Sequence, residues 1–160
     1  MKRHITLLLI APLLVLASCA KHPEAAAGSA PAAHHAHTAP HGGTLIEIGE
    51  HAYNLEFVRD AAAGKLTAYV LDGHAENFVR IKAAGFELVA GGGATKRVLA
   101  FRAAANPATG ETAGDTSQFE AQADWLKSDA TFDATLTSLE IKGTAFSAIA
   151  FHFPKGNDKD

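Results

Sequence analysis

Apolar and polar residues alternate with a period of two through most of the chain after Gly43, and this pattern restricts it to β-strands. The alternation is clearest near the C-terminus, where Ser147, Ile149, Phe151 and Phe153 share one face of an extended segment. The sequence Lys142-Gly143-Thr144 just before it predicts a tight hairpin with the preceding strand.

Nine short segments carry this alternation and are bounded by Gly, Asn, Asp or Pro, as strands commonly are. They are Thr44–Ile48, Tyr53–Val58, Leu66–Leu71, Asn77–Lys82, Phe86–Val89, Lys96–Arg102, Gln118–Ala123, Ala134–Lys142 and Ala145–Phe153. Residues 117–126 also fit a helical period, but the alternation of Phe119, Ala121 and Ala123 favours a strand. About eight or nine short strands in roughly 115 residues predict an all-β fold, an antiparallel β-sandwich of immunoglobulin-like type. A small barrel is the alternative.

The N-terminus has the pattern of a secretory signal peptide over residues 1–18. Two basic residues precede an apolar run that is shorter than the roughly 20 residues of a membrane-spanning helix. The run ends in Leu16-Ala17-Ser18-Cys19, which resembles the lipobox of bacterial lipoproteins. This resemblance implies that Cys19 is lipidated and anchors the protein in a membrane of the cell envelope. In that family an aspartate after the cysteine retains the protein in the inner membrane, so the resemblance, with Ala20 and Lys21 at these positions, implies the outer membrane, facing the periplasm.

The alternative is an ordinary signal peptide, cut near Ala17 or Ala20, in which Cys19 has no role. Residues 19–40 are rich in Ala, His and Pro, with nothing apolar larger than alanine after Cys19, and predict a flexible tether. Residues 41–155 then form the β-domain, and residues 156–160 a disordered tail.

Composition excludes several classes of function. With 14 Lys+Arg against 17 Asp+Glu, the formal net charge is -3, so nucleic acid is not an expected partner. The single cysteine excludes an intramolecular disulfide, and with the single methionine at position 1 it also argues against Cu(I) storage. No Gly-x-Ser-x-Gly segment occurs, and no pair of carboxylates is marked by spacing as acid and base, so the sequence predicts no enzyme.

Histidine is the residue type that suggests a chemistry. The chain has 9 histidines, and His34, His35, His37 and His41 lie within one short stretch. Neutral imidazole is a good ligand for Zn, Cu(II) and Ni, and a His-rich tract on a flexible segment is a plausible metal-collecting arm. The alternative is a low-complexity spacer without a ligand.

Hairpin registers predict where the remaining candidate ligands lie. A turn centred on Glu50 places Thr44 opposite Glu56 and brings His41 to the same end of the sheet. The next hairpin places His51 beside His74, and also near Asp72. The sequence thus predicts two clusters, His41 with Glu56 and His51 with His74, for which the alternative is isolated surface histidines. His152 is expected to be structural or exposed.

Four segments together resemble a pattern in small, mostly uncharacterised bacterial envelope proteins: His41-Gly42-Gly43-Thr44-Leu45, Gly49-Glu50-His51, Leu55-Glu56 and Leu66–Asp72. Similar His-Gly-Gly segments occur near the N-termini of heavy-metal efflux adaptors. The resemblance covers about residues 40–75 and implies an envelope location and a link to metal ions, carried by His41, His51 and Glu56.

The leading hypothesis is therefore a lipid-anchored envelope protein that binds Zn, Cu(II) or Ni as a buffer or accessory to a metal efflux system. The rival hypothesis is a structural lipoprotein that contacts another envelope protein and has no metal role.

Overall fold

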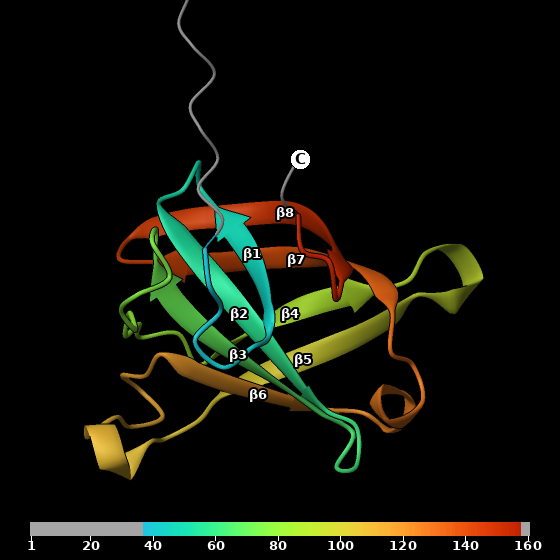
Figure 1. Ribbon diagram of the computed structural model, residues 1–160, viewed down its shortest axis with the longest axis horizontal. Helices are drawn as coiled ribbons and strands as arrows, with labels where there is room; N and C mark the ends of the chain where they lie inside the picture. The colour runs from blue at the N-terminus through green and yellow to red at the C-terminus, as the bar shows by residue number, and fades with distance from the viewer. Residues whose placement is uncertain (1–36, 158–160) are drawn as a thin grey trace, which may run out of the picture. The chain divides into compact units, whose positions relative to one another are not determined.

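The computed structural model describes residues 37–157, and the signal segment, Cys19, His34 and His35 lie outside this range. Eight antiparallel strands make up the fold (Figure 1). They are β1 (Thr44–Ile48), β2 (Tyr53–Asp60), β3 (Lys65–Asp72), β4 (Gly85–Ala90), β5 (Arg97–Ala103), β6 (Gln118–Gln122), β7 (Phe132–Ile141) and β8 (Thr144–Phe153). The described residues contain no α-helix, so the prediction of an all-β, antiparallel, sandwich-like fold is confirmed.

The strands form one continuous sheet in the order β1-β2-β3-β6-β5-β4-β7-β8. The sheet curls until β8 lies beside β1, so that the sandwich is nearly a closed barrel (Figure 1). Side chains bridge the gap between these two edges. The Thr44 hydroxyl donates to the carbonyl of Pro154 at 3.1 Å. The side chain of Asn157 accepts the backbone N–H of Glu47 and donates to the backbone carbonyl of the same residue. Asn157, in the segment expected to be a tail, thus helps to close the sheet.

The inside of the barrel is apolar, as the alternation requires. Leu55 and Phe57 of β2 and Leu66, Ala68 and Val70 of β3 are completely buried in one core. Aromatic rings fill its centre, with Phe57 stacked on Phe151 and Phe86 on Phe101. Burial of these side chains contributes about 1.5–3 kcal/mol each, which is the main stabilisation of the fold.

Short 3-10 helices occupy the loops: η1 (Gly93–Thr95), η2 (Pro107–Thr109) and η3 (Asp124–Lys127). The ambiguous segment 117–126 resolves into strand β6 followed by η3, whose Leu126 is buried in the core. Its two periodicities therefore belong to two consecutive elements.

The strand predicted over Asn77–Lys82 does not form. The N–H of Val79 donates to Val70, and two residues later Ile81 pairs with Thr116 instead. Because the segment changes partner so quickly, it makes only isolated bridges, Leu71 with Phe78 and Ile81 with Thr116.

Both predicted hairpin registers are wrong by one residue. Thr44 pairs with Phe57, and Leu45 pairs with Glu56. The reason is the loop length, since β1 ends at Ile48 and β2 begins at Tyr53, which leaves a loop of even length centred between Glu50 and His51. The β2–β3 loop has the same length and shifts its register in the same way.

Candidate functional site: a histidine cluster and an adjoining pocket

The segment before β1, residues 37–43, lies across the outer face of β1 and β2, and we call it the strap. Its His41 contacts Glu56 in the middle of β2, whereas His37 lies near Glu47 and His51 at the β1–β2 hairpin. The strap therefore runs antiparallel to β1, and it includes the last residues of the segment expected to be tether. The predicted pairing of His41 with Glu56 is present in the structure.

Glu56 points out of the barrel yet is completely buried, because the strap covers it. Its carboxylate accepts the backbone N–H of His41 at 2.7 Å and that of Gly43 at 2.9 Å. Its second oxygen lies 2.8 Å from Nδ1 of His41. Three hydrogen bonds to one carboxylate compensate its loss of water and hold the strap in place.

Each residue of His41-Gly42-Gly43 has a separate task in this arrangement. Gly42 adopts a φ of 68°, in the left-handed region that favours glycine, and turns the strap toward β1. A Cβ on Gly43 would lie 2.5 Å from the carbonyl oxygen of Phe57, so only glycine permits this close approach. The His-Gly-Gly segment is thus a docking element for the buried carboxylate.

A second cluster lies where the strap meets the β1–β2 hairpin. Ligand atoms of His37, Glu47 and His51 lie within 4.8 Å of one another, and Nδ1 of His51 is 2.8 Å from Oε1 of Glu47. This is the one group of three or more metal-ligating side chains among the described residues. Two ligand atoms on one zinc ion lie at most about 4 Å apart, because each zinc bond is about 2.0–2.1 Å long. The ligand atoms of this cluster lie within a distance close to that limit.

His74 borders this cluster but does not pair with His51 as predicted. Its ring packs edge-to-face on that of His37, with centroids 6.1 Å apart. Asp72, the other predicted neighbour, turns away and accepts the N–H groups of Glu76 and Asn77. The register shift and this turn explain why the predicted His51–His74 pair is replaced by His51–Glu47.

Sequence reasoning missed Glu47, although its spacing of four residues from His51 across a tight hairpin was a usable signal. It also missed Asn54, which pairs with Glu47 in the β1–β2 register. The amide of Asn54 donates to the carbonyls of Asp72 and Gly73, which fixes the start of the loop that carries His74. The carbonyl oxygen of this buried side chain has no hydrogen-bond partner among the described residues.

His152, whose side chain is 41% exposed, forms a simpler pair. Its Nδ1 lies 2.9 Å from Asp133, with no third metal-ligating group completing a cluster among residues 37–157.

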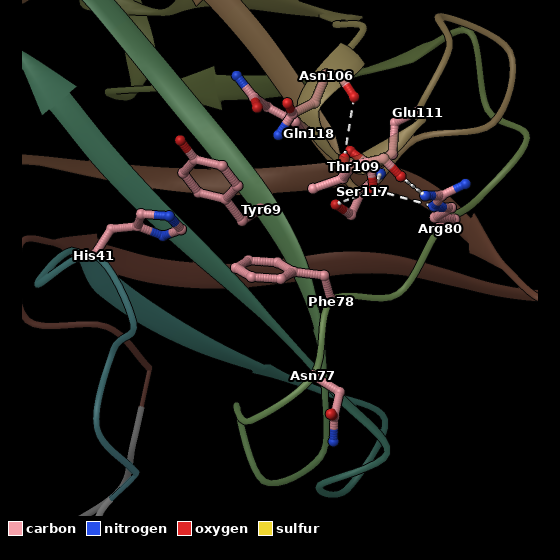
Figure 2. Close-up of a pocket in the computed structure, with 10 residues that line it drawn as sticks. All are labelled: His41, Tyr69, Asn77, Phe78, Arg80, Asn106, Thr109, Glu111, Ser117 and Gln118. Carbon is pink, nitrogen blue, oxygen red and sulfur yellow. Dashed lines mark hydrogen bonds and ion pairs between the residues drawn. The ribbon is translucent and has the colours of Figure 1, made fainter.

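A pocket opens on the other side of His41 (Figure 2). The His41 ring stacks on Tyr69 with centroids 4.0 Å apart, and Phe78 packs against both rings. Tyr69 and Gln118 extend the cross-strand row that begins with Leu45 and Glu56. Burial and, to a smaller extent, the negative charge of Glu56 raise the pKa of the Tyr69 hydroxyl.

Comparison with protein-family models, with curated proteins and with solved structures found no match to this chain. No helix among the described residues has the length and apolar character needed to cross a membrane.

Proposed function

We propose that this protein binds a divalent transition metal in the bacterial envelope, as a buffer or an accessory to metal efflux, and that Cys19 is its lipid anchor. The observation that carries the metal-binding proposal is the convergence of His37, Glu47 and His51, which come from the strap and from both sides of one hairpin. Two imidazoles and a carboxylate suit Zn, Cu(II) or Ni, and the donor set contains no thiolate.

His74 would supply a fourth donor beside the cluster. Structural zinc sites hold four protein ligands, whereas open sites hold three and leave one position free. A rotation of the His74 ring, which already contacts His37, would add its nitrogen to the set. In this proposal Asn54 acts as a positioning residue, because it anchors the loop that carries His74.

The test is calorimetric titration of the soluble chain, residues 20–160, with Zn, Cu(II) and Ni at neutral pH. His22, His34 and His35 are first replaced by alanine, so that the remaining tether histidines do not mask the domain site. We expect one ion per chain, with a Kd of about 1 μM or tighter. Replacing a ligand, His37→Ala or His51→Ala, should weaken binding by about 10–100-fold or more.

The matched control is His152→Ala, which removes a histidine that also has a carboxylate partner but belongs to no such cluster. It should leave the affinity unchanged. Millimolar affinity, or equal affinity in the His51→Ala and His152→Ala variants, would contradict the proposal and favour the interaction lipoprotein. If the titrations support the proposal, the metal content of the native protein purified from envelope identifies the ion.

A further inference from the structure

The pocket beside His41 has two chemically different walls (Figure 2). One is aromatic and consists of His41, Tyr69 and Phe78. The other is polar, with Asn106, Gln118 and Ser117 among its residues. The cavity volume of about 430 Å³ falls within the range of about 300–1,000 Å³ that is usual for small-molecule sites.

Each charged group that lines this pocket is already paired. Arg80 lies 3.4 Å from the buried carboxylate of Glu111 and also donates to the carbonyls of Thr109 and Gly110. His41 faces the carboxylate of Glu56. A charged ligand would find no free counter-ion among the lining residues, so the pocket suits an uncharged one.

Neutral hydrogen-bonding groups remain available to a ligand, although the amide nitrogen of Gln118 already donates to Glu120 at 3.2 Å and only its side-chain oxygen is left to accept. Among residues 37–157, the Tyr69 hydroxyl and the amide nitrogen of Asn106 make no hydrogen bond to the protein, whereas the Asn106 oxygen accepts the N–H of Ala108. The Tyr69 hydroxyl can donate, because a tyrosine hydroxyl with its ordinary pKa of about 10 is protonated near neutral pH.

The aromatic wall is exposed to an unusual degree. Phe78 is 48% exposed, and among the described residues only Val98 is another large hydrophobic side chain classed as exposed. An exposed aromatic face beside convergent amides and a hydroxyl fits a ligand that has one apolar face and a polar edge.

We propose that this pocket binds a neutral saccharide, with the C–H face of a pyranose ring on Phe78 and its hydroxyls toward Tyr69, Asn106 and Gln118. A pyranose combines an apolar face with hydroxyls that both donate and accept, which matches both walls. This proposal is independent of the metal site, because none of His37, Glu47 and His51 lines the pocket.

The test is NMR titration of the ¹⁵N-labelled chain, residues 20–160, with triacetylchitotriose and with maltotriose at millimolar concentrations. We expect saturable shifts of the Asn106 and Gln118 side-chain amides and of the backbone near Phe78. Phe78→Ala should weaken binding at least tenfold, and Gln118→Leu should also weaken it, whereas Val98→Ala should not. The spectra report whether each variant is folded.

Three outcomes would overturn the proposal: no shift with either saccharide, an unchanged affinity in a folded Phe78→Ala variant, or equal binding of the acidic trigalacturonate. His51→Ala should leave the saccharide affinity unchanged, so failure of the metal proposal and failure of this one are distinguishable.

Discussion

Nδ1 of His41 lies 2.8 Å from a carboxylate oxygen of Glu56, and the same carboxylate accepts the backbone N–H of His41. This double contact fixes both the backbone and the ring of one strap residue against the middle of β2. It links the candidate metal cluster, reached by the other end of the strap, to the pocket lined by the His41 ring.

Replacement of Glu56 should destabilise the fold more than replacement of an outward-facing residue usually does. Glu56→Ala leaves the N–H groups of His41 and Gly43 without their acceptor and removes a completely buried side chain. We expect the free energy of unfolding to fall by about 2–4 kcal/mol, measured by urea denaturation. Glu87→Ala, at an exposed position of β4, is the control and should change it by less than about 0.5 kcal/mol.

The three glycine positions Gly42, Gly43 and Gly92 should respond differently to alanine. Gly43→Ala forces a methyl group against the Phe57 carbonyl, and we expect a loss of about 3 kcal/mol or more. Gly42→Ala meets open space but has a positive φ, so its cost should be about 1–2 kcal/mol. Gly92→Ala meets open space at a φ of -145° and should be nearly neutral. A different order of urea midpoints would contradict the assignment of tasks within His-Gly-Gly.

His41→Ala should weaken metal binding although His41 is outside the proposed ligand set. Without its contact with Glu56 the strap is less well fixed, so His37 must be ordered when the ion binds. We expect a loss of about 3–10-fold in affinity, smaller than the loss in His37→Ala, by the same titration. A loss equal to or greater than that of His37→Ala would make His41 itself a ligand.

Asp72 should contribute stability that depends on pH. The side chain of Asn77 donates to its carboxylate, and this bond, with the backbone N–H groups of the turn, lowers the pKa of Asp72 below the ordinary 3.8. A lowered pKa in the folded state means that unfolding takes up a proton in acid, so the contribution is complete above 3.8 and is lost as the pH falls through the folded-state pKa.

Asp72→Ala should therefore lower the free energy of unfolding by about 0.5 kcal/mol near neutral pH, because solvent screens these exposed hydrogen bonds, with the difference from the parent protein vanishing in strong acid. Urea denaturation at several pH values measures it. Glu140→Ala, at an exposed position of β7, is the control, and an Asp72 effect that is constant with pH would contradict the role of these hydrogen bonds.

The alternation of side chains was sufficient to predict most strands, because burial on one face is a local property of each segment. It failed at Asn77–Lys82, where partners change within two residues and no ladder can develop. The register errors have a similar cause, since a loop longer by one residue shifts every pairing in its hairpin. The pattern alone does not specify the loop length.

The candidate site was predicted in part. His41 and Glu56 come together as expected, but through a strap that crosses the outer face rather than through strand pairing. Glu47 joins His51 because the hairpin brings residues four apart together, whereas the predicted partner Asp72 stabilises its own turn. Contacts of a segment without regular structure leave little periodic signal in a sequence.

The placement of the strap has a consequence for metal exchange. The strap lies outside the barrel, and the apolar core contains none of the side chains of the candidate metal cluster. Departure of an ion would therefore cost the domain none of its core packing, unlike a zinc finger, which unfolds when its metal is lost. Opening of the strap alone would remove the imidazole of His37 and leave Glu47 and His51 on the hairpin. If the proposed site holds an ion, it would release that ion to an acceptor one ligand at a time.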